Sequence, residues 1–256
     1  MTPITTNILR ASYERGEFSF GNPDSGRTVV LIGSCRIVPI LNNLRVYNSL
    51  HGDPFNLLCF DPVEMWAGPG NEVSDGVNRI LKDYRFGEVE YLVSEHVQYC
   101  GMLNTVRSSE QNVFDSLGCV PRLHIRLPNW NDMHIFDAET AVYDASYAVL
   151  DHDARVEELR RRTAVHKERF LGHCRGSSLP HLEEWTEENW LITRLGWTSS
   201  HPSLPLVWAI FNGIAGLMSL GVSRELASHP LCATDVYKAT GTVLTPVDYD
   251  ANNWKF

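Results

Sequence analysis

Short apolar runs, each bounded by turn residues, recur through the first half of the chain. They are rich in Val, Ile, Leu and Phe and predict strands at residues 28–32, 55–60, 89–93 and 123–127, the first of them buried. After the first run, apolar residues from Ile37 to Leu44 return at helical spacing, and residues 77–82 are predicted to form a further helix. Strands alternating with helices indicate an α/β fold with a parallel sheet between helical layers.

The second half of the chain has the spacing of long amphipathic helices. Asp151 is a predicted helix cap, and Gly176 ends the helix that follows. A break at Thr198–Pro202 precedes a third apolar helix, for which Gly221 is the predicted C-cap. We therefore expect one α/β domain over residues 1–256. Its parts are a lead-in (1–26), a strand-rich core (28–130), a largely helical C-terminal part (151–221) and a polar tail (234–256).

Composition narrows the class of protein. The 256 residues carry a net charge of −9, which argues against a nucleic-acid partner. The six cysteines have wide, irregular spacing and no CxxC pair, so we expect reduced thiols in a cytoplasmic protein and no metal site. The N-terminus has no signal-peptide pattern, and the apolar run 204–220 is more typical of a buried helix than of a membrane span.

Polar and nucleophilic residues follow the predicted strands. In parallel sheets the ligand site lies at the carboxyl ends of the strands. The residues that fall there are Cys35, Asp61, Glu95, His96 and Asn129.

Cys35 is the leading candidate for the chemical centre. It follows the first strand in the turn Gly33-Ser34-Cys35-Arg36. A helix N-terminus at this point would lower the pKa of the thiol, and the backbone N–H groups near Ser34 and Cys35 would receive an oxyanion. The alternative is a small buried cysteine that fills space at a strand end, which position alone makes equally frequent.

His201 is the predicted partner because a thiol nucleophile needs a base that titrates near neutrality. The alternative is a loop histidine that makes a capping contact. The arginines at 160–162 are candidates for gripping a phosphate, although such a run is more often a solvated helix face. The sequence has no P-loop, GxGxxG or HExxH motif.

Three motifs together resemble the WcbI-like polysaccharide biosynthesis proteins, a family of acetyltransferases. The segment from Val29 to Arg36 is similar to that family's first strand and Gly-Asn-Cys-Gln turn. Arg126–Asn129 is similar to its strand-end Pro-Asn. Leu182–Trp190 and Leu195–Ser203 are similar to its acidic helix and Asn-His-Pro-Thr segment. The order of these motifs holds across residues 28–221.

The resemblance implies a three-layer fold like that of the SGNH hydrolases, with coenzyme A or acetyl-CoA as co-substrate. Cys35 then stands where SGNH enzymes carry serine, and His201 stands at their late histidine. Ser34 and Arg36 depart from the family's Asn and Gln, and Thr198 replaces the SGNH aspartate three residues before the histidine. The resemblance therefore shows no complete triad.

Taken together, these features predict acyl transfer from a CoA thioester to a hydroxyl of a glycan-like acceptor. Cys35 and His201 are the expected catalytic pair, and Arg36 with residues 160–162 is a candidate for the CoA phosphates. The expected oxyanion or substrate-binding residues are Gly33, Ser34, Arg36, Glu95, His96, Asn129 and Ser200. Two alternatives stay open: a cysteine esterase on the same scaffold, and a non-catalytic glycan-binding or assembly protein with a tryptophan-lined surface.

Overall fold

The structure is a computed structural model that describes residues 1–61, 89–95, 121–130 and 133–256. The chain divides into two compact units. The sheet unit comprises Met1–Leu127 and Ala215–Ala233, and the helical unit comprises Pro128–Ile214 and Thr234–Phe256. The predicted helix at 77–82 and the candidate His96 lie outside the described residues.

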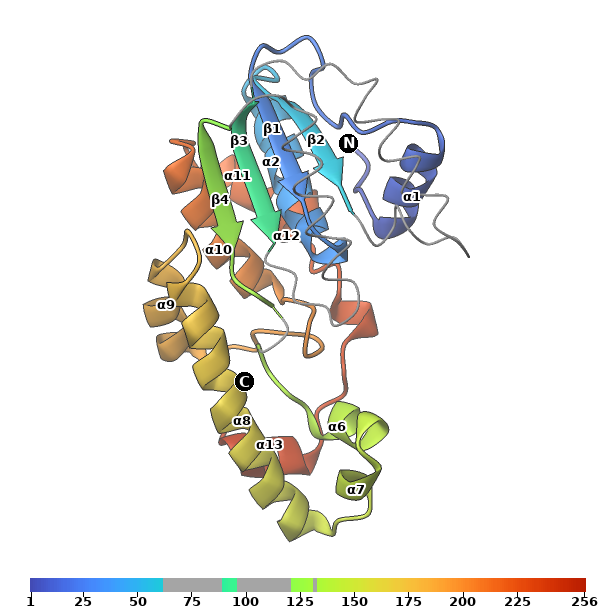
Figure 1. Cartoon of the computed structure of the whole chain (residues 1–256), viewed down its shortest axis with the longest axis vertical. Helices are drawn as coiled ribbons and strands as arrows, with labels where there is room; N and C mark the ends of the chain where they lie inside the picture. The colour runs from blue at the N-terminus through green and yellow to red at the C-terminus, as the bar shows by residue number, and fades with distance from the viewer. Residues whose placement is uncertain (62–88, 96–120, 131–132) are drawn as a thin grey trace. The chain divides into compact units, whose positions relative to one another are not determined.

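Within the described residues, four parallel strands form the centre of the sheet unit, in the order β2-β1-β3-β4 (Figure 1). Their bounds are β1 Thr28–Ile32, β2 Asn56–Phe60, β3 Val89–Glu95 and β4 Leu123–Leu127. All five residues of β1 and of β2 are buried. Strands buried on both faces are mostly apolar along their whole length, as the sequences of these two strands are. The predicted parallel α/β sheet is confirmed, and β3 extends two residues further than predicted, through Glu95.

Helices pack around this sheet. Beyond β1, a 3-10 turn (Cys35–Ile37) leads into α2 (Val38–Leu50), whose buried residues include Ile40, Leu41 and Leu44. The short helices α11 (Arg224–Ser228) and α12 (Pro230–Ala233) pack on α2. The lead-in contains α1 (Thr6–Glu14), which is joined to β2 by a stack of aromatic rings from Tyr13 through Phe18 to Phe60.

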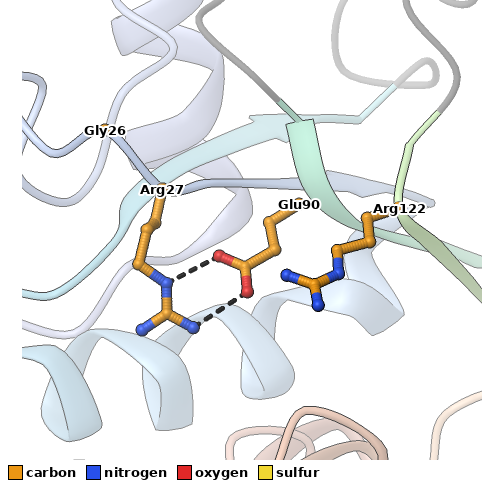
Figure 2. A pocket seen from close by; sticks show the side chains of 4 residues that line it. All are labelled: Gly26, Arg27, Glu90 and Arg122. Carbon is orange, nitrogen blue, oxygen red and sulfur yellow. Dashed lines mark hydrogen bonds and ion pairs between the residues drawn. The ribbon is translucent and has the colours of Figure 1, made fainter.

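At the amino ends of the strands, an ion pair joins the residue before β1 to β3. Arg27 Nε and Nη2 donate to the two carboxylate oxygens of Glu90 at 2.6 and 3.0 Å. Figure 2 shows the Glu90 carboxylate between the guanidinium groups of Arg27 and Arg122. The Arg27 guanidinium also lies 4.5 Å from the centre of the Phe55 ring. The Arg27–Glu90 ion pair ties the residue before β1 to β3 at the amino ends of the strands, opposite to Cys35, so we interpret it as structural.

The helical unit is built from amphipathic helices. Its described elements are α6 (Asp137–Tyr143), α7 (Ala145–Ala148), α8 (His152–Arg175), α9 (His181–Asn189), the greater part of α10 (Leu204–Leu217), a 3-10 turn (Lys238–Thr240) and α13 (Pro246–Asn252). The predicted cap is confirmed, because the Asp151 side chain accepts a hydrogen bond from Ala154 N at the start of α8. Gly176 follows the last residue of α8, as predicted.

The core of the helical unit joins α8 to α13. Ile135, Tyr147, Leu159, Val247 and Ala251 form one buried cluster. Nearby, a buried polar network holds the start of α6 against α13: Asp137 N donates to the carboxylate of Asp248 at 2.8 Å, and the Tyr147 hydroxyl donates to the carboxylate of Asp137 at 2.7 Å. Buried polar groups with partners of this kind fix one packing of the helices.

One predicted boundary is wrong. Helix α10 ends at Leu217 and does not continue to a C-cap at Gly221. Leu217 is already 40% exposed, and Ser219 has the left-handed backbone conformation (φ 57°) that ends the helix. Among the described residues, no helix is long and apolar enough to cross a membrane.

Candidate functional site

Cys35 lies at the carboxyl end of the central strand β1, where the chain turns sharply into α2. Gly33 permits this turn because its backbone passes very close to β3. A Cβ atom on Gly33 would lie 2.9 Å from Glu95 Oε2 and 3.1 Å from the Cβ of Ile37. Any larger residue would push Glu95 or the 3-10 turn away. The Cys35 thiol is partly exposed, unlike those of Cys59, Cys174 and Cys232, which are buried.

A buried network fixes the turn that carries Cys35. Glu95, the last residue of β3, accepts hydrogen bonds from the Ser34 backbone N–H at 2.8 Å and from the Ser34 hydroxyl at 2.9 Å. Arg36 Nε lies 2.5 Å from Glu95 Oε1 and 2.9 Å from Ser34 Oγ. The side chains of Arg36 and Glu95 are each only 1% exposed. The structure therefore brings four predicted residues together: Gly33, Ser34, Arg36 and Glu95.

This network changes two expected roles. The Ser34 N–H, which we expected to receive an oxyanion, donates to Glu95 instead. Arg36, a candidate for the CoA phosphates, is buried beside Glu95 and does not present its charge to solvent. Both residues hold the Cys35 turn in place.

The expectation of a lowered thiol pKa is wrong for this arrangement. The pKa of Cys35 is raised to about 11, first by burial and then by the negative charge of Asp61. Glu95 raises it further, while Arg36 and a hydrogen bond from Ser34 act in the opposite direction. Cys35 opens a 3-10 turn and not α2 itself, and burial is the largest cause of its raised pKa. The resting sulfur is a neutral thiol.

Asp61, directly after β2, raises the pKa of Cys35, an effect that the sequence did not predict. It is fully buried, and its backbone N–H donates to the Tyr13 hydroxyl at 2.9 Å. The same hydroxyl donates to the carbonyl of Cys59 at 3.1 Å. No local pattern connects a tyrosine in the lead-in to this edge of the sheet, because the contact depends on how α1 folds back onto β2.

Replacing Asp61 by Asn is expected to lower the pKa of Cys35, because a neutral amide removes the charge that opposes the thiolate. At a pH below the pKa, lowering the pKa by one raises the thiolate fraction about tenfold. We expect iodoacetamide to modify Cys35 faster in Asp61→Asn than in the unchanged protein at pH 8. Mass spectrometry of the Cys35 peptide measures the rate, and Asp24→Asn, an exposed change, is the control. Equal rates in all three proteins would contradict this electrostatic account.

His201 lies in the helical unit, in a loop closed by a bridge between Gly196 and Pro202. Its ring Nδ1 lies 2.8 Å from Thr198 Oγ1, and the ring centre is 4.7 Å from that of Tyr237. Thr198 Oγ1 also accepts hydrogen bonds from the backbone N–H groups of Ser200 and His201. Thr198 thus orients the imidazole of His201.

The remaining predicted residues are distributed as follows. Ser200 is half-buried in the His201 loop, and Asn129 is buried two residues after the end of β4. Asn129 belongs to the helical unit, with His201, whereas Cys35 belongs to the sheet unit. The pairing of Cys35 with His201 stays a prediction. In the described part of the chain, no three His, Cys, Asp or Glu side chains form a group that would hold a metal ion.

The arginines of α8 are engaged with acidic neighbours. Arg160 pairs with Glu157, and Arg161 pairs with Glu158. Arg162 contacts both Glu158 and Asp144, each at 2.6–2.7 Å. These contacts favour the interpretation of residues 160–162 as an ion-paired helix surface over that of a phosphate-binding site.

The parallel sheet and the turn at its carboxyl edge define the class: an α/β protein with a partly exposed cysteine after its central strand. No protein-family model matches the chain, and a search of curated proteins finds no significant match. Among solved structures, the chain is similar to WcbI, described as a novel polysaccharide biosynthesis enzyme. The TM-score is 0.57 at 15% identity, over 90% of this chain and 80% of WcbI. This likeness shows a shared fold.

The WcbI structure is described as the native protein without a disulfide bond between coenzyme A and one of its cysteines.

Proposed function

We propose that this protein transfers an acyl group from a CoA thioester to a hydroxyl of a glycan-like acceptor. The observation that carries the proposal is the partly exposed thiol of Cys35, held by a buried network at the carboxyl end of the central strand. This is the edge where parallel α/β sheets bind their ligands. The association of WcbI with coenzyme A and polysaccharide synthesis supports the choice of donor and acceptor.

The raised pKa of Cys35 determines what the mechanism needs. A neutral thiol is a weak nucleophile, so a base must remove its proton as the reaction proceeds. We assign that role to His201, whose ring Thr198 orients through Nδ1. In the first step the Cys35 sulfur forms a bond to the acyl carbon, and the bond from that carbon to the CoA sulfur breaks. The thiol proton passes through His201 to the departing CoA sulfur.

The second step returns the enzyme to its resting state. The acceptor hydroxyl gives its proton to His201, and its oxygen forms an ester bond to the acyl carbon. The bond between that carbon and the Cys35 sulfur breaks, and His201 returns the proton to the sulfur. Glu95, Ser34 and Arg36 act as positioning residues for Cys35 in both steps, through the contacts described above.

Replacing either Cys35 or His201 by Ala is expected to reduce acyl transfer by about a thousandfold or more, because each removes the nucleophile or its base. The assay incubates the full chain with [14C]acetyl-CoA and candidate glycans and follows label in the glycan. His152→Ala is the matched control, because His152 is an exposed histidine of the same unit that contacts Asp250. Unchanged turnover in both Cys35→Ala and His201→Ala would refute the assignment of these residues as nucleophile and base.

The same assay separates transfer from hydrolysis. Labelled glycan without free acetate supports the transferase, whereas free acetate released from the thioester regardless of glycan favours the cysteine esterase.

A further inference from the structure

A hollow of about 440 Å³ lies within the helical unit, bordered by α6, α8 and the loop that carries His201. The side chains that line it include those of Glu139, Tyr143, Asp144, Arg162 and Ser199. Ser199 stands two residues before His201, and its backbone N–H donates to Glu139 Oε2 at 3.0 Å. The hollow therefore shares a wall with the loop that holds the proposed base.

The charges around the hollow argue against an anionic ligand. Asp144 and Arg162 pair with each other at 2.6 Å, and Arg162 also contacts Glu158 at 2.7 Å. Glu139 adds a further carboxylate, so the lining has no excess of positive charge. A phosphate or carboxylate ligand would find no unneutralised cation among these side chains, and a neutral ligand fits them better.

The hydrogen-bonding groups of the lining both donate and accept. Arg162 uses Nε and Nη2 in its ion pairs, and its Nη1 makes no hydrogen bond within the described residues. Each Glu139 oxygen accepts one hydrogen bond, from Ser199 N and from Thr242 Oγ1, which leaves further lone pairs on the carboxylate. The Ser199 hydroxyl can do either. A ligand that matches must itself offer groups that donate and accept, as hydroxyls do.

Tyr143 supplies an apolar surface beside these polar groups. Its side chain is 88% exposed at the end of α6, and the neighbouring Val142 is 76% exposed. A tyrosine ring offers a flat face against which the C–H groups of a sugar ring can pack, while its hydroxyl reaches water or the ligand. Large apolar side chains exposed beside a hollow commonly mark a binding surface.

We propose that this hollow binds a neutral, hydroxyl-rich ligand, a carbohydrate, with one sugar ring against Tyr143 and its hydroxyls bonded to Arg162, Glu139 and Ser199. Its role as the acceptor subsite rests on the proposed function; the binding itself does not. The ligand would then contact Ser199, in the same loop as His201.

The experiment measures sugar binding in the absence of any acyl donor. The full chain carrying Cys35→Ala is titrated with cellotriose, maltotriose and chitotriose, and ligand saturation-transfer NMR gives the Kd. We expect at least one trisaccharide to bind saturably, with Tyr143→Ala raising its Kd about tenfold and Ser199→Ala raising it several-fold. Tyr249→Ala, at a tyrosine of α13 that is 41% exposed and does not line the hollow, should leave the Kd unchanged.

Two results would overturn the proposal: no saturable binding of any of the three sugars, or binding that Tyr143→Ala and Ser199→Ala both leave unchanged. Inorganic phosphate is titrated in parallel, and saturable phosphate binding that depends on Arg162 while no sugar binds would likewise overturn it. Sugar binding that needs Tyr143 in a protein without transferase activity would uphold this site and refute the proposed function. Conversely, acyl transfer to a glycan at a rate that Tyr143→Ala leaves unchanged would uphold the proposed function and refute this site.

Discussion

Replacing Glu95 by Ala is expected to destabilise the sheet unit by about 3–5 kcal/mol, the cost of removing one side of a buried ion pair. The Arg36 guanidinium is 1% exposed and pairs with Glu95, whose carboxylate also accepts two hydrogen bonds from Ser34. Without Glu95 the positive charge stays buried, and the Ser34 N–H loses its acceptor. Urea unfolding followed by circular dichroism measures the change in the free energy of unfolding.

Two further variants test whether burial of the Arg36–Glu95 ion pair is what makes its loss costly. Glu90→Gln breaks the pair with Arg27, whose side chain is 49% exposed, and should cost less than about 1 kcal/mol. The double variant Arg36→Met with Glu95→Met removes both buried charges and should recover most of the stability lost in Glu95→Ala. A Glu95→Ala protein as stable as Glu90→Gln would show that the Arg36 charge is not confined to the interior.

Acidification is expected to weaken the helical unit through His134. This side chain is fully buried, with its ring centre 4.6 Å from that of Trp190 and 4.9 Å from that of Trp254. Burial, reinforced by the positive charge of Arg194, lowers the pKa of His134 to about 3, while the backbone of Trp190 acts in the opposite direction. The folded protein therefore keeps the imidazole neutral among aromatic rings.

The direction of this pH dependence follows from the pKa values of His134 in the folded and unfolded states. The unfolded chain binds a proton near pH 6.5, and the folded protein binds it only near pH 3. Between these values the unfolded state holds more protons, so stability is full above pH 6.5 and falls as the pH decreases towards 3. The contribution of His134 amounts to a loss of about 3 kcal/mol between pH 6.5 and pH 4.

The measurement compares the pH dependence of unfolding in the unchanged protein and in His134→Met. Methionine has a similar volume and cannot be protonated. Any change in packing therefore shifts the free energy of unfolding equally at every pH and does not alter its dependence on pH. The difference in unfolding free energy between the two proteins should change with pH only between 6.5 and 3. A difference that stays flat across that window would contradict a neutral buried His134.

The sequence predicted the fold where local pattern and tertiary packing agree. The strands at 28–32 and 123–127 have the predicted bounds because turn residues stand at the ends of both runs. The cap at Asp151 was equally visible, since a capping side chain bonds to a backbone group three residues away. Such signals are local, and they also place Cys35 and Glu95 at one edge of the sheet.

The electrostatics of the site could not be predicted in the same way. The pKa of Cys35 depends on Asp61 and Glu95, which lie 26 or more positions away in the sequence, and on burial. Arg36 looked like an exposed cation because arginine usually is one, and only the meeting of β1 with β3 buries it beside Glu95. The contact between Thr198 and the His201 ring depends on the folded loop, so the identity of residue 198 alone does not predict it.

The neutral thiol of Cys35 has a consequence for oxidative stress. Peroxide reacts with thiolates, and a thiol with a pKa of about 11 is ionised in only about one molecule in ten thousand at pH 7. Cys35 is thus slow to form a sulfenic acid even though it is partly exposed. Burial, together with the negative charges of Asp61 and Glu95, thus keeps Cys35 in the neutral form that peroxide attacks slowly.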